Sequence, residues 1–341
     1  MTSTAVVILN WNGRELLRHY LPSVIANSCS VPGVEVIVAD NASSDGSIQM
    51  LHDEFPSVPV ISFDKNYGFA GGYNRALAAL RHDYVVLLNS DVAPAPGWLS
   101  PLISLLDADP SVLACGPKIR DDKRDSFFEY AGAAGGFVDA FGYPFCRGRV
   151  MDSVEEDRCQ YDDDADVLWV SGAALMVRRQ AYIDAGGLDE DFFAHMEEID
   201  LCWRLRNRGG RVVACGAGFV FHLGGATLDA SNPRKTFLNF RNNLSMIIKN
   251  YNRHSWPFLL FARLCLDGVA ALKFLLSGKP SFFWAVVRAH FAMWTSLPSL
   301  IAKRAALRPF RSSQLCDGVK PYSMIWRHVI RHRQNFSDLD N

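Results

Sequence analysis

Short apolar runs that each stop at a polar turn limit the fold of this chain more than any other feature of its sequence. Each run is long enough for one buried strand, and helical spacing of apolar residues fills two of the intervals, at 14–27 and 73–82. The four predicted strands are AVVIL (5–9), VEVIVAD (34–40), VPVISF (58–63) and YVVLLN (84–89). This alternation predicts an α/β layer around a largely parallel sheet, in which ligands bind outside the carboxyl ends of the strands.

Polar turns follow three of these strands, and their side chains are candidates for ligand binding. The turns are NWNG (10–13), DNASSDG (40–46) and NSD (89–91). Asp91 suits a divalent cation that also contacts a substrate diphosphate, because Mg²⁺ and Mn²⁺ prefer oxygen ligands. Asp40 could accept a hydrogen bond from a ribose hydroxyl or a base N–H. Both aspartates also fit ordinary turn chemistry, so the turns alone leave both interpretations open.

A second group of acids lies in HMEEIDLCWR (195–204), where Glu197, Glu198 and Asp200 begin an apolar helical pattern. The simplest interpretation is that the helix dipole favours acids in a first turn. His222 follows the apolar run GFVF, which is typical of a core histidine, although its ring could also bind a metal. Neither the acidic group nor His222 is sufficient by itself to indicate a function.

The middle of the chain gives weaker signals. Residues 120–165 are rich in glycine and aromatic residues, and the acidic stretch at 153–166 predicts a mobile loop. A strand followed by a helix is predicted over 167–187. The runs at 211–216 and 218–225 are predicted to be strand or loop.

Charge is distributed unevenly along the 341 residues. The formal net charge is −1, yet Ser231–Asn341 holds 17 Lys and Arg against 4 Asp and Glu, whereas Met1–Ala230 holds 18 against 32. This asymmetry predicts a basic tail that meets an anionic surface. The eight cysteines show no CxxC or zinc-like spacing, and no signal peptide is apparent before the first strand. We therefore expect reduced thiols in a cytoplasmic protein.

Two apolar segments of the tail, 256–278 and 281–304, are predicted to be amphipathic helices. Arg263, Asp267 and Lys273 fall within about 120° of one another on the first helix and leave a broad apolar face. Three charges disfavour a membrane-spanning helix. We expect these helices to lie on an anionic membrane surface, peripheral to its cytoplasmic face. A buried helical subdomain and an oligomer interface are the alternatives.

The order of the motifs resembles that of one known family. Between about residues 4 and 250 the chain contains, in this order, VVILNWNG, EVIVADNASSDGS, NYGFAGGYNRAL, VVLLNSDV, GGLDEDFFAHMEEIDLCWRLRNRGG and FHLGGA. This ordered set resembles inverting family 2 glycosyltransferases with a GT-A fold, in the bacterial branch that includes rhamnosyl- and galactofuranosyltransferases. The resemblance implies a GT-A catalytic domain at 1–235 and a C-terminal helical region at 236–341.

The implied reaction moves a rhamnose-like sugar or another hexose from a nucleotide-diphosphate sugar to a hydroxyl of a glycan. The acceptor is expected to be lipid-linked and to serve cell-surface polysaccharide synthesis. Inversion needs a single in-line displacement, with a base that activates the acceptor and a divalent metal, Mg²⁺ or Mn²⁺, that neutralises the departing diphosphate.

The resemblance also implies roles for single residues. Asp91 and His222 correspond to the protein ligands of the metal, and Glu198 corresponds to the base. Glu197–Glu198 replaces the family's Glu-Asp pair, so that Glu197 could share or take the role of base, and Asn89 replaces the first acid of the DxD-type motif. The residues expected in the nucleotide-sugar pocket are Asn10, Asn12, Asp40, Asn41, Asn66, Asn74, Asn89, Ser90, Trp169 and Gly172.

Two other functions compete with this interpretation. A nucleotidyltransferase also combines an α/β sheet with a metal, but it usually needs a glycine-rich basic loop near the first strand, where NWNGRE supplies only Arg14. An inactive membrane-bound scaffold is the other alternative, and the presence of Asp91, Glu198 and His222 disfavours it. No nucleic-acid partner is expected.

Overall fold

A computed structural model describes residues 2–224, 232–310 and 316–339 of the chain. A mixed sheet forms the centre of this part of the molecule. Its strands are β1 Thr4–Asn10, β2 Val34–Asp40, β3 Val60–Ser62, β4 Tyr84–Leu88, β5 Val92–Pro94, β6 Val112–Asp121, β7 Arg124–Phe128, β12 Ala165–Asp166, β13 Ala174–Arg178 and β14 Arg211–His222. They run in the order β12-β14-β6-β13-β4-β1-β2-β3, with β5 beside β14 and β7 beside β6.

The first half of this sheet is parallel, as the sequence predicts. β1 pairs in parallel with β2 and β4, and β2 pairs in parallel with β3. β13 is antiparallel to both of its neighbours, so the whole sheet is mixed. Val6 and Ile8 of β1 face one hydrophobic core and Ala5 and Val7 face the other, because side chains alternate along a strand. A strand buried on both faces needs a continuous apolar run, which AVVIL supplies.

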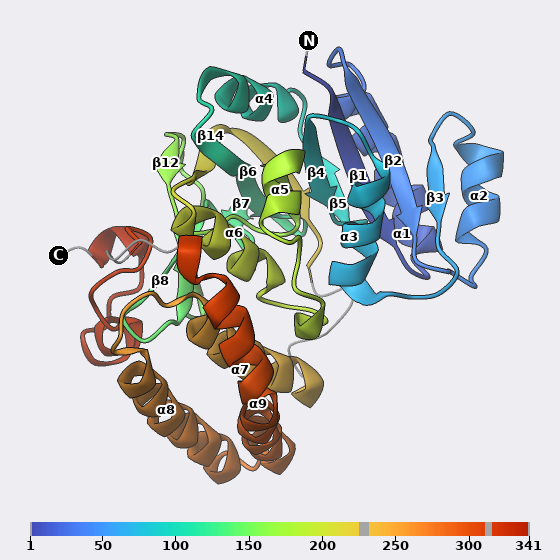
Figure 1. Ribbon diagram of the computed structural model, residues 1–341. Helices are drawn as coiled ribbons and strands as arrows, with labels where there is room; N and C mark the ends of the chain where they lie inside the picture. The colour runs from blue at the N-terminus through green and yellow to red at the C-terminus, as the bar shows by residue number, and fades with distance from the viewer. Residues whose placement is uncertain (1, 225–231, 311–315, 340–341) are drawn as a thin grey trace.

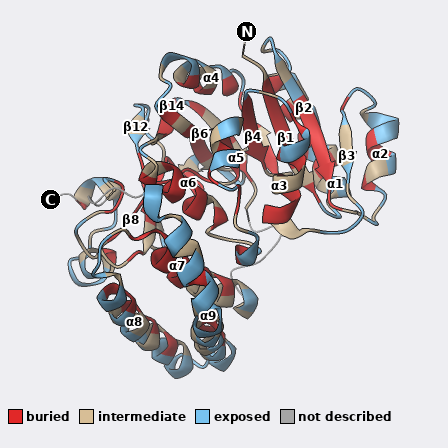
Figure 2. Cartoon of the chain, in the orientation of Figure 1, coloured by how far each residue is buried: buried red, intermediate tan, exposed pale blue. Residues whose placement is uncertain are grey.

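Helices cover both faces of the sheet (Figure 1). Their bounds are α1 Arg14–Ser28, α2 Ser47–Glu54, α3 Gly68–Ala79, α4 Leu99–Ala108, α5 Arg179–Asp184, α6 Glu197–Asn207, α7 Pro233–Asn250, α8 Trp256–Leu276 and α9 Pro280–Ala306. Buried residues of α1, α2 and α4 join the core on one face, and those of α3, α5, α6 and α7 join the core on the other. In Figure 2 the strands of the main sheet are mostly buried, whereas exposed and intermediate residues predominate on α8 and α9.

Several predicted elements differ from the structure. The helix predicted at 73–82 begins at Gly68, because the sequence GFAGG looks like a loop yet supplies the first turn. The strand predicted from 167 begins only at Ala174. The predicted runs at 211–216 and 218–225 become one strand, β14, which ends at His222 and has an irregularity between Cys215 and Phe219; residue 225 lies outside the described residues. Helices α2 and α4 and strands β5 and β6 are not predicted from the sequence. The predicted strands at 5–9, 34–40 and 84–89 and the helix at 14–27 are confirmed.

Part of the central segment, where the sequence signals are weak, forms a small second sheet. Its strands are β8 Gly136–Val138, β9 Pro144–Cys146, β10 Arg149–Val150 and β11 Ser153–Val154. The acidic stretch at 153–166 is mostly irregular between β11 and β12, and ion pairs tie it to the rest of the protein; its mobility stays a prediction. Lys118 Nζ lies 3.1 Å from Asp157, Arg120 lies 2.6 Å from the same carboxylate, and Arg147 lies 2.6 Å from Asp163.

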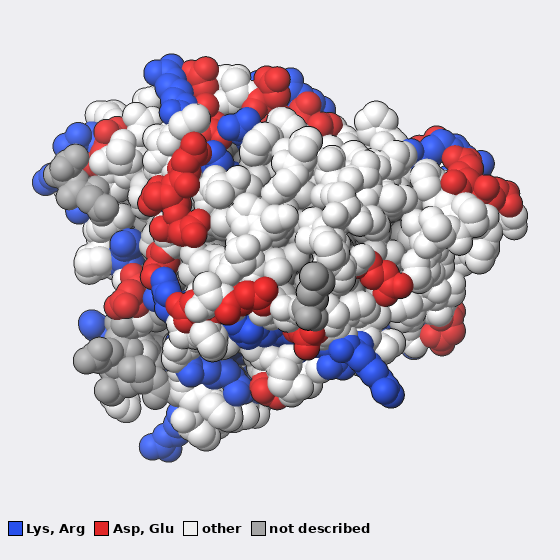
Figure 3. Space-filling model, turned by 90° about the horizontal axis from the view of Figure 1, so that it is seen from above, with Lys and Arg blue, Asp and Glu red and all other residues white. Residues whose placement is uncertain are grey.

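On the face shown in Figure 3, acidic and basic side chains lie interspersed around a wide uncharged area. The charge asymmetry along the sequence therefore produces no single-sign field on that face. None of the eight cysteines forms a disulfide.

The C-terminal helices lie below the sheet in Figure 1, with α9 packed along α7 and α8. α7 spans the predicted domain boundary at 235, and its Met246 and Ile247 belong to the core of the sheet. The division into two domains therefore stays a prediction. Within the described ranges, no helix combines the length and apolar character that a membrane crossing requires.

Two of the three charged residues of α8, Arg263 and Asp267, face inward, whereas Lys273 is exposed. Arg263 and Asp267 are 2% and 0% exposed, and Arg263 donates to Asp267 at 3.2 Å and to the Phe141 carbonyl at 3.2 Å. The opposite side of α8 and the adjoining side of α9 expose ten large apolar side chains, which we call the α8–α9 apolar face. They are Phe258, Phe261, Val269, Leu272, Leu275, Leu276, Trp284, Phe291, Trp294 and Ile301.

Candidate active site

The turns after β1 and β2 are joined by hydrogen bonds at the carboxyl edge of the sheet. Asn10 Nδ2 donates to Asp40 Oδ2 at 2.9 Å and to Ser43 Oγ at 3.1 Å, and the Ser43 amide donates to Asp40 Oδ1 at 2.8 Å. Asn12 accepts from the Ser44 amide at 2.8 Å. Parallel pairing of β1 with β2 places Asn10 opposite Asp40, which is why residues 30 positions apart meet.

Asn41 and Asn66 order the loop that leads into α3. Asn41 Nδ2 donates to Asn66 Oδ1 at 3.0 Å and to the Gly68 carbonyl at 3.0 Å, while its oxygen accepts from the Tyr67 amide at 2.9 Å. Gly68 has a φ of +73°, a left-handed conformation that glycine adopts without strain. Both asparagines therefore shape the loop at this edge, and their place in the nucleotide-sugar pocket stays a prediction.

Asp91 and His222 meet through strand pairing, although 131 positions separate them in the sequence. His222 is the last residue of β14 and lies opposite Val92 of β5, which directly follows Asp91. The Leu223 amide donates to the Asp91 carbonyl at 3.1 Å, and His222 Nε2 lies 3.2 Å from Asp91 Oδ1. Asn89 Nδ2 lies 3.3 Å from the same ring nitrogen.

A residue that the sequence analysis missed, Glu129, completes this group. Its Oε2 lies 3.5 Å from His222 Nδ1 and accepts from the Ala131 amide at 2.6 Å. Burial alone would lower the pKa of His222, but the Asp91 and Glu129 carboxylates outweigh it and raise that pKa to about 10. The imidazole is therefore protonated at neutral pH unless a cation displaces the proton. The signal for Glu129 is a lone acid inside the apolar stretch FFEYAG, where Glu129 and the preceding Phe128 are both buried.

The three acids in the first turn of α6, Glu197, Glu198 and Asp200, differ in their interaction partners. Asp200 is fully buried and is paired with two basic side chains: Arg204 Nε donates to it at 2.8 Å and Lys249 Nζ donates to it at 2.9 Å. Burial would raise the Asp200 pKa, but these two cations lower it. Glu197 and Glu198 have no such partner among the described residues, and one oxygen of each carboxyl is buried without a hydrogen bond. Burial raises the pKa of Glu198 to about 7 and that of Glu197 well above its usual range.

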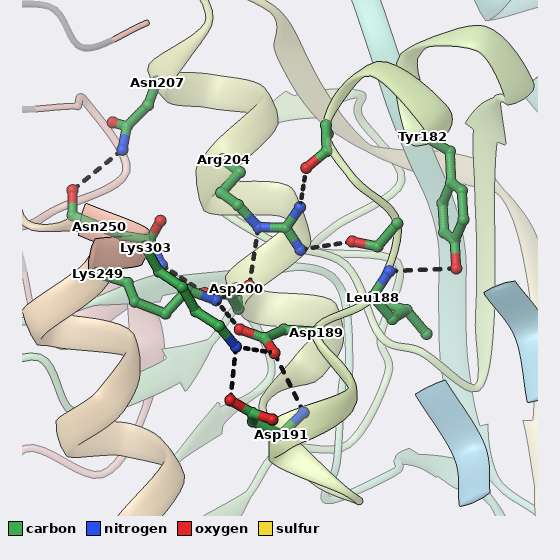
Figure 4. A network of polar contacts seen from close by, with 12 residues as sticks. Tyr182, Leu188, Asp189, Asp191, Asp200, Arg204, Asn207, Lys249, Asn250 and Lys303 are labelled. Carbon is green, nitrogen blue, oxygen red and sulfur yellow. Dashed lines mark hydrogen bonds and ion pairs between the residues drawn. The ribbon is translucent and has the colours of Figure 1, made fainter. Parts of the chain in front are cut away.

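The Asp200 group belongs to a larger network that fixes α6 against the C-terminal helices (Figure 4). Lys249 of α7 also binds Asp189 at 2.5 Å, and Lys303 of α9 binds Asp189 at 2.6 Å and Asp191 at 2.7 Å. Burial would raise the Asp189 pKa, but Lys249 and Lys303 hold it well below its usual range. Asp200 therefore has a structural role, whereas Glu197 and Glu198 take no part in this network and are candidates for a catalytic role.

The four residues before α6, Phe193–Met196, form a strained loop that we call the 193–196 loop. Phe193, His195 and Met196 have φ values of +65°, +68° and +74°, which are unusual for residues other than glycine. Asn242 of α7 holds this loop in place. Its side-chain amide donates to the carbonyls of Phe192, Ala194 and His195 at 3.0, 2.8 and 2.8 Å. Such strain often accumulates at functional sites, and here it precedes Glu197 and Glu198 directly.

Gly172 links Glu198 to the turn that carries Asp91. A Cβ added to Gly172 would lie 3.4 Å from both Cβ and Cγ of Glu198, so the glycine allows the two segments to approach closely. The next residue, Ala173, accepts a hydrogen bond from the Asn89 amide at 3.0 Å. Ser90 lies beside the first turn, since a Cβ at Gly13 would lie 3.8 Å from its hydroxyl. The structure therefore brings the three turns and Glu198 to one edge.

Two residues predicted for the pocket, Trp169 and Asn74, make their polar contacts with other parts of the protein. Trp169 is 2% exposed, packs on Gly136, and donates from its ring nitrogen to the Phe137 carbonyl at 3.0 Å, so it is a core residue. Asn74 uses both ends of its side chain inside the protein. It donates to the Leu188 carbonyl at 2.8 Å and accepts from the Tyr182 hydroxyl at 2.6 Å. These contacts give both residues a structural role that their sequence position does not reveal.

The arrangement can hold a divalent cation only with help from a ligand. Within the described part of the chain, no group of three or more His, Cys, Asp and Glu residues is placed to form a metal site by itself. Asp91 and His222 offer one carboxylate oxygen and one imidazole nitrogen 3.2 Å apart. This pair fits Mg²⁺ or Mn²⁺ whose other positions are filled by phosphate oxygens and water.

Known proteins resemble this chain in sequence. The N-acetylglucosaminyl-diphospho-decaprenol L-rhamnosyltransferase of Mycobacterium tuberculosis is 31% identical over 205 residues, which cover 55% of this chain and 66% of that protein. The pre-mycofactocin glycosyltransferase of the same species is 30% identical, over 54% of this chain and 36% of that protein. This chain thus spans just under two thirds of the first relative and about one third of the second.

Two solved structures share the fold. GalNAc-T7, solved with UDP, GalNAc and Mn²⁺, superposes with a TM-score of 0.59 at 15% identity, over 88% of this chain and 58% of that one. The mannosyltransferase PcManGT of Pyrobaculum calidifontis, solved with GDP-Man and Mn²⁺, gives 0.53 at 17% identity, over 90% of this chain and 81% of that one. The predicted GT-A fold of the α/β part is confirmed. The sequence profile described as glycosyl transferase family 2 matches residues 5–182, so this chain belongs to glycosyl transferase family 2.

Proposed function

We propose that this protein is a metal-dependent, inverting glycosyltransferase that moves a hexose, rhamnose or a similar sugar, from a nucleotide-diphosphate sugar to a lipid-linked glycan. The observation that carries this proposal is the meeting of Asp40, the Asp91–His222 pair and Glu198 at one edge of the sheet. The name of the mycobacterial relative, which specifies an N-acetylglucosaminyl-diphospho-decaprenol acceptor, supports a lipid-diphosphate acceptor.

Glu198 is the base in this proposal. Its unpartnered oxygen removes the proton from the acceptor hydroxyl while the oxygen of that hydroxyl attacks the anomeric carbon. The new C–O bond forms as the bond to the donor diphosphate breaks, and the electron pair leaves with the nucleoside diphosphate. A single displacement inverts the anomeric configuration and needs no covalent enzyme intermediate. Glu197 is more deeply buried and keeps a proton through its raised pKa, which leaves Glu198 as the carboxylate that can ionise near neutral pH.

Asp91 Oδ1 and His222 Nε2 would hold the divalent cation, and Glu129 would orient the imidazole from its other nitrogen. When bound, such a cation neutralises negative charge on the leaving diphosphate. Asp40, Asn41 and the Asn10 turn would contact the nucleotide. Both solved glycosyltransferases of this fold were crystallised with Mn²⁺ and a nucleotide ligand, which supports the same choice here.

Hydrolysis of nucleotide sugars tests this function. We expect the purified chain to release free sugar slowly from one member of a panel of UDP-, GDP- and dTDP-sugars when Mg²⁺ or Mn²⁺ is present. Chelation by EDTA should abolish the release, because the donor diphosphate is not neutralised without the cation. The measurement is chromatography of the released nucleotide and sugar. Failure with every donor, or undiminished turnover in EDTA, contradicts the proposal.

The α8–α9 apolar face is proposed to bind a membrane surface. Its exposed side chains include Phe261 at 69% and Trp294 at 50%, and soluble surfaces rarely gather so many large apolar groups. The surrounding segment is basic, which favours anionic lipid. The protein would then lie peripherally on the cytoplasmic side of the membrane, where a lipid-linked acceptor is within reach.

Vesicle flotation tests this attachment with point variants of the full-length chain. Truncation is unsuitable, because α9 packs along α7 and Lys303 binds Asp189. We expect Phe261→Gln combined with Trp294→Gln to reduce flotation with phosphatidylserine vesicles by at least tenfold, because the headgroup boundary would lose two large apolar anchors. Ile183→Gln on α5, 41% exposed, is the matched control and should float normally. Equal flotation of all three proteins would assign the apolar face to another partner.

A further inference from the structure

Three arginines gather on one side of α7 and α9 around two phenyl rings. Arg234, Phe237 and Arg241 are three and four positions apart, so they share one face of α7. The guanidinium of Arg241 lies 5.4 Å from the Phe237 ring centre, and that of Arg288 on α9 lies 5.7 Å from the same centre. Arg234 lies 5.0 Å from the ring of Phe193. We call Arg234, Arg241 and Arg288 the arginine cluster.

Carboxylates do not neutralise this cluster. Among the described residues, none of the three arginines has an Asp or Glu oxygen within 4.0 Å. Asp267 is the only acid between 231 and 310, and it is fully buried against Arg263. The nearby Asp191 carboxylate is occupied by Lys303 at 2.7 Å. Burial also lowers the pKa of Arg241, as expected for a cation that lacks a full countercharge.

The arginine cluster touches the loop that precedes the proposed base. Arg241 Nη2 donates to the carbonyls of Asp191 and Phe192 at 3.0 and 2.8 Å, at the start of the 193–196 loop. Phe193, under Arg234, also lies against the turn before α3, since a Cβ at Gly68 would be 3.7 Å from its ring. One end of the cluster is therefore next to the catalytic edge.

The other end of the cluster joins the α8–α9 apolar face. Trp284 lies four positions before Arg288 and Phe291 lies three positions after it, so both aromatic side chains neighbour this guanidinium on α9. Arg288, Trp284 and Phe291 are all exposed. A continuous path thus runs from exposed aromatic residues, across unneutralised guanidinium groups, to the base.

We infer that the arginine cluster binds the diphosphate of a polyprenyl-diphosphate-linked acceptor, with its lipid on the α8–α9 apolar face and its sugar at Glu198. This inference rests on the proposed function and adds the place where the acceptor is recognised. Guanidinium groups match phosphate oxygens with paired N–H donors, and the order apolar, cationic, catalytic matches the order lipid, diphosphate, sugar. Arg241 also positions the 193–196 loop, so acceptor binding and the geometry of the base share one side chain.

Binding of a sugar-free probe tests this inference apart from catalysis. The probe is farnesyl diphosphate in phosphatidylcholine vesicles, compared with vesicles that carry equal charge as phosphatidylserine. We expect the full-length protein to prefer the diphosphate vesicles, and Arg234→Gln with Arg288→Gln to weaken that binding by about tenfold or more, because each arginine makes charge-assisted hydrogen bonds. Arg288→Lys should recover only part of the affinity, since lysine keeps the charge but loses the paired donors.

Arg308→Gln is the matched control, because it removes one exposed cation beyond the end of α9, twenty positions after Arg288. It should keep the preference for diphosphate. Donor hydrolysis should be unchanged in Arg308→Gln, and a missing hydrolysis in the unmodified protein would contradict the proposed function and not this site. Equal binding of both vesicle types, or an equal loss in Arg308→Gln, would show a general attraction to anionic membranes and overturn the inference.

Discussion

Glu198→Gln is expected to lower turnover by about 10²–10⁴-fold, because the amide cannot accept the acceptor proton. Donor affinity should change little, since glutamine is nearly the same size and Gly172 leaves the same space beside it. Turnover with a saturating acceptor and donor affinity by calorimetry separate the two effects. Glu197→Gln is the matched variant, with the same chemical change one position earlier in α6.

The pH dependence of turnover provides a second test of the same role. Burial raises the Glu198 pKa to about 7, so the fraction of ionised base should fall as the pH decreases below about 7. The acid limb of the profile should be absent in Glu198→Gln.

Stability should change in the opposite direction to activity. A carboxyl whose pKa is raised by folding stabilises the folded state at low pH, and that contribution is lost as the pH rises through about 7. Glu198→Gln should therefore have a higher Tm than the unmodified protein at pH 8 and a similar one near pH 4.

A large loss of turnover in Glu197→Gln, with near-normal turnover in Glu198→Gln, would move the role of base to Glu197.

The sequence could predict the parts of the site that depend on local patterns. Apolar runs identify the buried strands, and their polar ends identify Asn10, Asp40 and Asp91 as neighbours once a parallel sheet is assumed. Partners brought by tertiary packing were not accessible in this way. Asp200 looks like Glu197 and Glu198 in the sequence, and only Lys249, 49 positions later, shows that it is structural.

The same reason explains the contacts of two predicted pocket residues and of α8, which the sequence does not reveal. Trp169 and Asn74 belong to motifs that border the site, but their side chains are fully used by contacts inside the protein. Helical spacing placed Arg263 and Asp267 on one stripe of α8 and suggested an apolar opposite face. In the structure Arg263 and Asp267 are buried and the apolar face is exposed, because Arg263 donates hydrogen bonds to Asp267 and to the Phe141 carbonyl.

Substitution of Asp91 or His222, the proposed metal ligands, is the second change for which we expect a large effect. Asp91→Asn and His222→Ala are each expected to lower Mn²⁺ affinity in the presence of donor nucleotide by about 100-fold or more, since even partners outside the coordination sphere cost 10–100-fold. Mn²⁺ titration followed by electron paramagnetic resonance measures this without any turnover. Glu129→Gln should cause a smaller loss, because Glu129 contacts His222 only through its other ring nitrogen.

Combining the two substitutions shows whether one ion joins them. If Asp91 and His222 bind the same cation, the first substitution already removes most of the affinity, and the double variant should lose much less than the product of the single losses. Asp107→Asn, an exposed acid on α4 that binds Thr2 and Tyr84, controls for the change of charge and should bind Mn²⁺ normally. Independent, multiplicative losses would place the two residues on separate functions. The 3.2 Å contact between Asp91 and His222 would then be an ordinary ion pair of a protonated histidine, and the site would have to neutralise the diphosphate with other groups.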